Sequence, residues 1–277
     1  MAETVMQIEG LFYTYPDGKE ALRGIDFQVE KGHKVFFHGA NGAGKTTMFQ
    51  CINGLLKIKR GTVRLHGKTV TKEAERMKQI GIVFQNAADQ IVAGSVFDEI
   101  AFGPMNLGFS PERVVELVEE SLKLLNIEHL RDRPPHFLSY GEKKRVCIAS
   151  VLSMKQEIVI LDEPTSGLDA RQKEELVDTL NRLTNEGRTL LISTHDADFS
   201  FRCADRVIVL HEGRLLCEGK TEEIFSRSDV LEKAALVKPI LMEVHEKLTE
   251  YSYLEPGAVP KNLEELSRLL QQKRSVT

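Results

Sequence analysis

The sequence predicts an α/β protein whose core is a parallel sheet with an antiparallel β apron, and three observations carry this prediction. An apolar run at residues 35–37 leads into the glycine-rich loop at residues 39–47. Two more apolar runs, at residues 158–161 and 189–193, have strand length and suit parallel strands covered on both faces. From residue 85 onward helix signals replace strand signals, so we expect a helical subdomain inserted at about residues 86–153.

Composition sets broad limits on the class of protein. The 277 residues are 42% hydrophobic and 28% charged, which fits one large or two small globular domains and excludes disordered and fibrous proteins. The formal charge of −4 gives no basic excess, so nucleic acid is not favoured as a partner. Singly scattered cysteines indicate a reducing compartment, and no apolar run approaches the ~18–20 residues of a spanning helix. We expect a cytosolic protein that reaches a membrane only through partners.

The chain begins with short strands joined by turns, at residues 6–15, 25–29 and 35–38. The turns between them carry Pro16-Asp17-Gly18 and Lys31-Gly32. Tyr13 and Tyr15 share one face of the first strand, since side chains alternate with a period of two, and either ring offers a flat surface for a purine. The alternative is that each tyrosine is a half-buried aromatic of the apron.

The loop that follows matches G-x-x-x-x-G-K-T, the P-loop of nucleoside triphosphatases, and a helix should run from Lys45 to about residue 55. Glycines let backbone N–H groups point at a phosphate, and the helix N-terminus adds positive dipole. Lys45 can reach the β- and γ-phosphates, and Thr46 can offer its hydroxyl to Mg²⁺, with Thr47 packed or hydrogen-bonded beside it. The other loop residues that we expect to contact the nucleotide are Gly39, Asn41, Gly42, Ala43 and Gly44.

The middle of the chain continues with a hairpin at residues 62–67 and a short buried strand at residues 80–84 that stops at Gln85. In the helical region Ser110 is a good N-cap with Pro111 at the first helical position. This helix should end before residues 131–135. A second helix is expected from Ser139 to about residue 154.

Carboxylates and a histidine follow two of the buried strands. Asp162 and Glu163 end the run at residues 158–161, and His195 follows the run at residues 189–193. The carboxyl ends of parallel strands meet at the edge where the phosphate loop opens, so these side chains should gather there. Asp162 would hold Mg²⁺ through water, Glu163 would polarise an attacking water, and His195 would bond the γ-phosphate. Taken singly, each has a structural alternative, namely a helix cap with a solvated charge, or a packed histidine.

A second anion site is predicted at the start of the helix that follows Leu138. Ser139 and Glu142 form the S-x-x-E pattern of a capping box, and the alternative is that they serve only as this cap. Gly141 in the first turn is poor for helix stability, which is understandable if an anion approaches the backbone closely.

The last part of the chain should contain a helix at residues 173–184 and a closing hairpin at residues 206–218. We expect the core to close near residue 225, so that a nucleotide-binding domain spans residues 1–228. Apolar residues then repeat at helical spacing, with breaks at Pro239 and residues 255–257. The C-terminal helical extension at residues 229–277 is predicted to form two amphipathic helices, which either pack back on this domain or present a dimerisation surface.

Taken together, these motifs resemble the ATP-binding-cassette (ABC) ATPases over about the first 225 residues. The resemblance identifies a Walker A loop at residues 39–47, a Walker B strand at 158–163, the Q-loop at Gln85, the signature at 138–142, the D-loop at residues 166–169 and the switch histidine at His195. It implies a P-loop NTPase core with ATP and Mg²⁺ as cofactors, and catalysis by Glu163, His195 and Gln85. It places Thr46, Gln85 and Asp162 around the metal.

The same resemblance implies that Tyr15 stacks on adenine, with Tyr13 supporting it, and that Asp169 belongs to the D-loop. In this family the signature meets the γ-phosphate of the opposite subunit, which implies a dimer. Here the signature departs from Leu-Ser-Gly-Gly-Gln, because Tyr140 replaces the first glycine and Glu142 replaces the glutamine. Ser139 and Gly141 are intact, so hydrolysis is expected.

A narrower resemblance lies in Phe-Gln-Asn-Ala-Ala-Asp-Gln-Ile at residues 84–91 and continues at residues 96–108. These stretches are similar to the ATPase component of energy-coupling-factor (ECF) importers, which take up vitamins, cobalt and nickel. The Leu-Ser-Tyr-Gly-Glu-Lys-Lys-Arg form at residues 138–145 is most similar to the cobalt/nickel branch. This implies a second ATPase subunit, either an identical copy or a homologue, whose contact the C-terminal helices help to hold. It also implies integral membrane subunits and a location on the inner face of the cell membrane.

Two other functions are open. An ABC ATPase without a transporter, acting in DNA repair or translation, usually carries long coiled coils, zinc-binding cysteines or two cassettes, none of which is seen in this sequence. A module that binds a nucleotide without turnover is disfavoured by the presence of both Glu163 and His195.

Residues 86–103 are predicted to dock the membrane subunits, because Gln85 lies where the core leads into the helical subdomain. This docking stretch has more apolar residues than a surface loop needs, interleaved with acids that could pair with a basic partner helix. The apolar residues are Ile91, Val92, Val96, Phe97, Ile100 and Phe102, and the acids are Asp89, Asp98 and Glu99. The alternative is that the apolar residues pack the subdomain while the acids face water.

Overall fold

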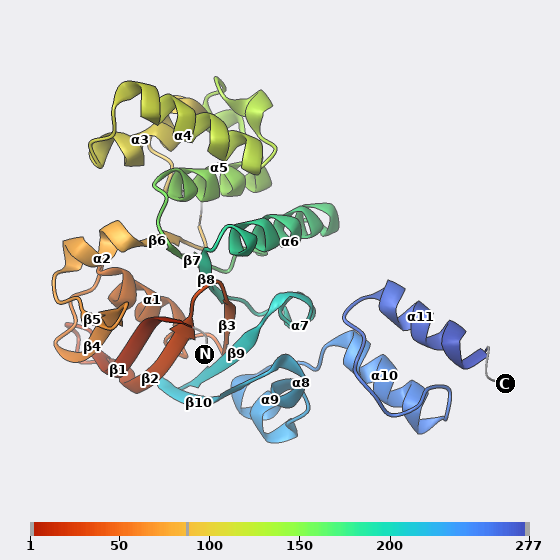
Figure 1. The fold of residues 1–277 in the computed structure, drawn as a ribbon. Coiled ribbons are helices and arrows are strands. Elements are labelled where there is room, and N and C mark those ends of the chain that lie inside the picture. Colours follow the sequence, from red (N-terminus) through yellow and green to blue (C-terminus); the bar gives the residue numbers. More distant parts are fainter. Residues whose placement is uncertain (1–2, 87–88, 275–277) are drawn as a thin grey trace.

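The computed structural model describes residues 3–86 and 89–274. Ala87 and Ala88 of the docking stretch and residues 275–277 of the predicted extension lie outside the described residues. The centre of the molecule is a six-stranded sheet with the order β10-β9-β3-β8-β7-β6 (Figure 1). Its strands are β3 (Lys34–His38), β6 (Ile80–Val83), β7 (Ile158–Asp162), β8 (Thr189–Ser193), β9 (Arg206–His211) and β10 (Arg214–Gly219).

Pairing within this sheet is parallel from β6 to β9, and β10 closes one edge as an antiparallel hairpin with β9. Strand β3 lies between β8 and β9, so the loop after it opens beside the carboxyl ends of both neighbours. The predicted parallel core and closing hairpin are confirmed.

A second, four-stranded sheet forms the predicted antiparallel apron, with the order β2-β1-β4-β5. Its strands are β1 (Thr4–Thr14), β2 (Glu20–Glu30), β4 (Arg60–Leu65) and β5 (Lys68–Thr69). Strands β1 and β2 are longer than predicted, because the polar residues at their ends also pair with each other across the two strands. Arg23 N donates to Gly213 O at 2.8 Å, which ties the apron to the end of the main sheet.

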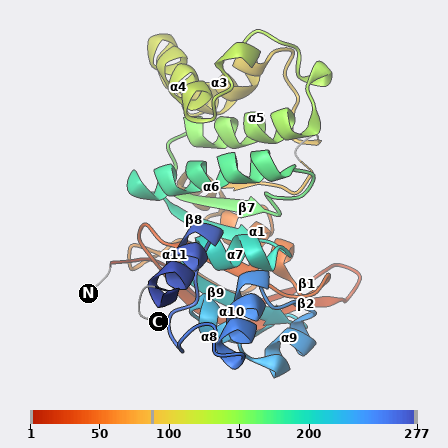
Figure 2. The ribbon, with the colours of Figure 1, turned by 90° about the vertical axis from the view of Figure 1, so that its right-hand side faces the viewer.

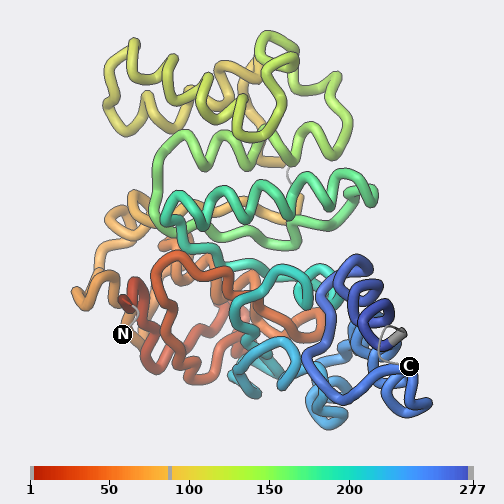
Figure 3. Tube along the Cα trace, turned by 45° about the vertical axis from the view of Figure 1, so that its right-hand side comes forward, coloured from red at the N-terminus to blue at the C-terminus, as the bar shows by residue number. Residues whose placement is uncertain are grey.

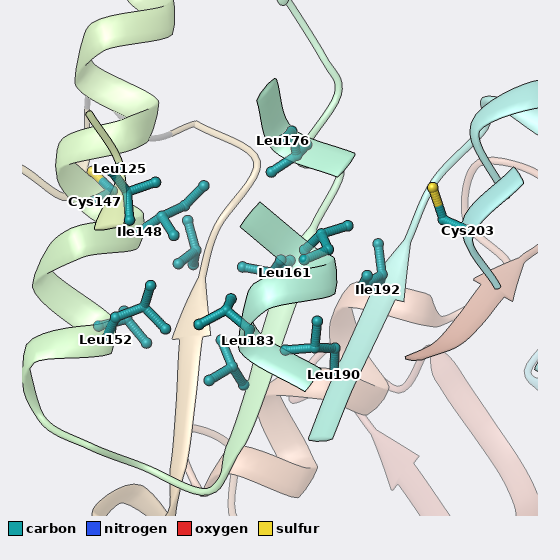
Figure 4. Packing of buried hydrophobic residues seen from close by; sticks show 14 of the residues in the cluster. Leu125, Cys147, Ile148, Leu152, Leu161, Leu176, Leu183, Leu190, Ile192 and Cys203 are labelled. Carbon is teal, nitrogen blue, oxygen red and sulfur yellow. The ribbon is translucent and has the colours of Figure 1, made fainter. Parts of the chain in front are cut away.

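Side chains of the central strand alternate between two hydrophobic clusters, one on each face of the main sheet. Phe36 belongs to one cluster, and Val35 and Phe37 belong to the other. Figure 4 shows the first cluster, in which Leu161 and Leu190 of the sheet face Leu152 and Leu183 of the covering helices. Burial on both faces explains why these strands are uninterrupted apolar runs in the sequence.

Helix α1 (Lys45–Asn53) follows the phosphate loop and ends at Gly54, whose φ of 108° stops it slightly earlier than predicted. Helix α6 (Ala170–Asn185) begins earlier than predicted because Asp169 caps it. The short helices α2 (Glu73–Gln79) and α7 (Ala197–Cys203) were not predicted. Each has seven residues, too few for a helical period to stand out.

The helical subdomain lies at the end of the molecule opposite the apron and the C-terminal helices (Figures 2 and 3). It contains α3 (Val96–Asn106), α4 (Pro111–Leu124) and α5 (Tyr140–Ser153), with 3-10 turns at Glu128–Leu130 and Pro135–Phe137. Ser110 and Ser139 cap α4 and α5 as predicted. Ser95, which lies within the docking stretch, caps α3. Helix α5 lies between α3 and α4 on one side and the sheet on the other.

The C-terminal part forms α8 (Thr221–Phe225), α9 (Ser228–Ala234), α10 (Ile240–Glu250) and α11 (Leu263–Arg274). The stretch predicted as one interrupted helix is α9 and α10, which separate at a left-handed Ala235 and at Pro239. Val230, Ala234 and Met242 are buried in the core cluster, so α9 and α10 pack on their own chain. The domain boundary at residue 228 stays a prediction. Within the described residues, no helix combines the length and the apolar character that crossing a bilayer requires.

Candidate active site at the carboxyl edge of the sheet

The phosphate loop wraps around its own lysine. Gly44, with a φ of 105°, starts α1, and Lys45 Nζ donates to Gly39 O at 2.6 Å and to Ala40 O at 3.4 Å. A side chain at Gly39 would bring its Cβ within 2.2 Å of Leu210 O, so the close approach of β9 requires glycine there. Burial lowers the pKa of the Lys45 ammonium, and the carboxylates of Glu163 and Asp162 oppose this shift.

Asp162 ends β7 beside the start of α1. Thr46 Oγ1 donates to Asp162 Oδ2 at 2.7 Å, and Ser193 Oγ, at the end of β8, donates to the other carboxylate oxygen. Asp162 is 3% exposed, and its two oxygens are held by hydroxyl groups from the first turn of α1 and from the end of β8. Ser193 is a site residue that was not predicted, although its place at the end of the strand before His195 offered a signal.

Glu163 lies next to Asp162 with a left-handed backbone, at a φ of 50°. Its N–H donates to Ser193 O at 3.1 Å and to Ser193 Oγ at 3.0 Å. His195 Nε2 lies 3.2 Å from Glu163 Oε1, and His195 N donates to Oε2 at 3.3 Å. Burial raises the pKa of the Glu163 carboxyl, whereas His195 and Lys45 oppose this. A buried carboxylate that is held by a histidine suits a general base.

Tyr15 lies at the other end of the loop. Its hydroxyl forms a 2.8 Å hydrogen bond with Thr47 Oγ1, which agrees with the prediction that Thr47 bonds beside the site. The Tyr13 ring meets the Tyr15 ring edge-on, with centroids 5.1 Å apart. This contact orients the Tyr15 ring at the wall of the cavity.

A cavity of about 960 Å³ joins these groups. The predicted residues that line it are Tyr15, Asn41, Gly42, Ala43, Gly44, Lys45, Thr46, Thr47, Gln85, Asp162, Glu163 and His195. Cations that the sequence analysis missed line it too, namely Lys19 and Arg23 near the first turn, and Lys173 of α6, which pairs with Asp196 at 2.6 Å. They lie close in sequence to Tyr15 and Asp169, but a single lysine or arginine on a strand or helix carries no pattern that marks it as a nucleotide contact. The cavity has the size and the cationic groups that a nucleoside triphosphate requires.

Four predicted nucleotide contacts are not among the residues that line this cavity. The Gly39 carbonyl accepts from Lys45 Nζ instead, and Ser139, Gly141 and Asp169 lie at the starts of α5 and α6. Asp169 Oδ1 accepts from Gln172 N at 2.8 Å, which makes Asp169 the N-cap of α6. Ser139 caps α5, and Glu142 Oε2 accepts from Ser139 N at 2.7 Å and from Ser139 Oγ at 2.8 Å.

Gly141 also packs against a helix of its own chain. We expected a glycine there so that an anion could approach the backbone. In the structure Gly141 is buried, and a Cβ on it would lie 2.5 Å from Gln172 Nε2 of α6. Any larger residue would displace the end of the Gln172 side chain, so packing of α5 against α6 also favours glycine here, and the approach of an anion stays a prediction.

The docking stretch also differs from the prediction. Glu99 is buried, and its Oε2 accepts from Val92 N and Ala93 N, each at 2.9 Å. The expectation that Glu99 faces a partner is wrong, because its carboxylate holds a loop of its own subdomain. Val96 and Ile100 are buried in the core cluster, whereas Val92 and Phe102 are exposed.

Comparison with known proteins gives consistent matches. Residues 22–166 match the ABC transporter family model. The chain is 42% identical to the energy-coupling factor transporter ATP-binding protein EcfA of Carboxydothermus hydrogenoformans, over 96% of this chain and 97% of that protein. It is 39% identical to a putative ABC transporter ATP-binding protein of Methanosarcina mazei, over 96% of this chain but only 60% of that relative's length.

Among solved structures, cbiO1 from Clostridium perfringens, part of the ABC transporter complex cbiONQ, superposes with a TM-score of 0.76 at 36% identity. The match covers 89% of this chain and 99% of cbiO1. Sequence, fold and site geometry agree. The chain therefore belongs to the ABC transporter ATPases, and among them to the ATP-binding subunits of energy-coupling-factor transporters.

Proposed function

We propose that this chain works as a dimer that binds and hydrolyses ATP to drive uptake of cobalt or nickel ions through separate membrane subunits, on the inner face of the cell membrane. The observation that carries the proposal is the convergence of Lys45, Asp162, Glu163 and His195 on one cavity at the carboxyl edge of the sheet. Phosphate release by the purified chain tests the hydrolysis. A chain that binds ATP without releasing phosphate would be a nucleotide-sensing module instead.

Each group in the cavity has a distinct role in this proposal. Lys45 binds the β- and γ-phosphates, and the Tyr15 ring stacks on adenine. Thr46 Oγ1 and Asp162 Oδ2, 2.7 Å apart, are hard oxygen donors of the kind that Mg²⁺ prefers, and Gln85 lines the same cavity. Bound Mg²⁺ would neutralise charge on the phosphates. Glu163 accepts a proton from the attacking water, and His195 orients the Glu163 carboxylate and bonds the γ-phosphate.

Dimerisation is proposed because the groups at the starts of α5 and α6 lie outside this cavity. Ser139, Gly141 and Asp169 would complete the site of a second chain, which is either identical or homologous. Turnover per chain should then rise with protein concentration. Full activity that does not depend on concentration would contradict the dimeric mechanism.

For the membrane subunits we propose an exposed apolar surface around α3, in place of the acids alone. Phe102 is 57% exposed, Met105 is 64% exposed and Val92 is 75% exposed, although all three are large apolar residues. Asp89 and Asp98 remain exposed beside them. Phe102→Ser with Met105→Ser should prevent co-purification of the membrane subunits while basal hydrolysis continues. Intact assembly would place the docking surface elsewhere. Glu99 is unsuitable for this test, because its reversal would disrupt the subdomain.

The C-terminal helices are proposed to help join the two ATPases. Ile240 and Val244 of α10 and Leu263 of α11 are exposed, while the other side of α10 packs on the core. The transported solute contacts the membrane subunits, so uptake must be measured in cells. To identify the transported solute, uptake of radioactive cobalt, nickel and vitamins is compared between cells with and without this gene. Vitamin uptake alone would refute the metal assignment and leave the ATPase assignment intact.

A further inference from the structure

Lys144 of α5 is a buried lysine that the catalytic roles above do not use. It is 1% exposed, yet it lies beside the active site. Its Nζ donates to Glu163 O at 2.6 Å and to Gln85 O at 3.3 Å, and lies 5.8 Å from the centroid of the Tyr140 ring. The Lys144 ammonium therefore bonds the backbone of Glu163 and of Gln85 in the Q-loop, and it lies near the Tyr140 ring of the signature.

Tyr140, the residue that replaces the first signature glycine, makes the same connection. Its hydroxyl donates to Gln85 O at 3.0 Å, the carbonyl that Lys144 also approaches. Its ring covers Gly167, where an added Cβ would lie 2.5 Å from Tyr140 Cε1. Two side chains of α5 therefore hold the backbone of Gln85, Glu163 and the loop after Glu163 together.

The backbone at Glu163 needs such support. A glutamate with a φ of 50° is in a region that residues other than glycine rarely adopt, and it persists only where neighbours fix it. Ser193 fixes the N–H of Glu163, while Lys144 and Ser166 N, at 3.2 Å, fix its carbonyl. Burial lowers the pKa of Lys144 to about 8, which shows that the buried ammonium charge has a desolvation cost. A methionine of similar volume would avoid this cost.

We propose that Lys144 and Tyr140 are positioning residues that fix Glu163 and Gln85 relative to the signature helix, and so aim the catalytic carboxylate. The proposal rests on the catalytic role of Glu163. It also accounts for the tyrosine in the signature, because a glycine at position 140 could neither bond Gln85 O nor cover Gly167.

The test compares Lys144→Met, Tyr140→Phe and the double variant with wild type. In Lys144→Met, kcat should fall about tenfold to a hundredfold, as for other residues that orient catalytic groups, while KM and the Kd of a non-hydrolysable ATP analogue stay within about threefold. Tyr140→Phe removes only the hydroxyl and should lower kcat about threefold to tenfold. Because both donors share Gln85 O, the double variant should lose less than the product of the two effects.

Hydrogen exchange supplies a readout that does not depend on turnover. In Lys144→Met, peptides covering residues 80–86 and 158–167 should exchange faster. The matched control is Lys143→Met, which removes the same charge from the preceding position of α5, where the lysine side chain forms no hydrogen bond or ion pair with the residues that the structure describes. It should leave kcat and exchange as in wild type.

The proposal would be overturned if Lys144→Met and Tyr140→Phe both keep the wild-type kcat. It would also be overturned if kcat, ATP affinity and thermal stability fall together, because that result indicates a purely structural role. If Lys144→Met does not fold, the kcat of Tyr140→Phe and its hydrogen exchange at residues 80–86 test the proposal. Absence of hydrolysis in wild type would instead refute the proposed function, so the two failures are distinguishable.

Discussion

Glu163→Gln gives the sharpest test of the chemistry, because it replaces one carboxylate oxygen with an NH₂ group and keeps the shape of the side chain. The amide cannot accept the proton of the attacking water. Losses of a general base cost about 10²–10⁴-fold in rate. This corresponds to about 3–5 kcal/mol in the activation barrier, since each tenfold change is about 1.4 kcal/mol.

The structure predicts that this loss is not caused by unfolding. Burial raises the pKa of the Glu163 carboxyl, so the ionised form is less favourable in the folded protein than in the unfolded chain. This cost is present when the pH is above the folded pKa, and it disappears below the unfolded pKa. A neutral glutamine removes it. The variant should therefore melt at or above the wild-type temperature at neutral pH.

The assay is phosphate release under saturating ATP, with affinity for a fluorescent ATP analogue and size-exclusion chromatography alongside. ATP should bind with unchanged affinity and hold the variant as a dimer on the column. Glu212→Gln is the matched control, because Glu212 is an exposed carboxylate that lines the same cavity but forms no hydrogen bond or ion pair with His195 or Lys45. A Glu163→Gln rate within about threefold of wild type would refute the assignment of the base.

Three other predictions concern binding, stability and assembly. Lys45→Ala should weaken ATP affinity itself, measured by calorimetry, because it removes a charge-assisted contact to the phosphates, and unchanged affinity would contradict the loop assignment. Leu161→Ala leaves a cavity at a fully buried position of β7 and should lower the free energy of unfolding, measured by urea denaturation, by about 2–5 kcal/mol. Leu55→Ala, at a 47% exposed position, should change it by less than about 0.5 kcal/mol. Truncation after residue 228 removes Val230, Ala234 and Met242 from the core and should lower the melting temperature. Truncation after residue 258 spares them, removes only the bond from Lys261 to Thr221 and nearby contacts, and should lower the melting temperature less while weakening self-association. Equal melting temperatures for the two truncations would show that α9 and α10 do not stabilise the core.

Much of the site could be predicted because its signals are local. The phosphate loop needs only a strand, three glycines and Lys45 in succession, and the buried strands are apolar runs because both of their faces are covered. Asp162 and His195 each follow such a run, so their common edge follows from the geometry of parallel strands.

The tertiary structure decided what depends on contacts between distant segments. Glu99 has the sequence context of a surface acid, but two backbone N–H groups of a folded loop make its burial favourable. The amphipathic pattern of α10 shows that one face needs a partner, and only packing shows that Met242 meets the core of its own chain.

The sequence by itself determined a nucleotide-binding α/β core, because strands, helices and the phosphate loop are specified by residues that are neighbours along the chain, and the order of its motifs gave the resemblance to ABC ATPases. Only the tertiary structure decided that Lys144 and Tyr140 bond the backbone of Gln85 and Glu163. These contacts join residues that are 19 to 59 positions apart, and their acceptors are carbonyl groups, which every residue carries and no sequence pattern can mark.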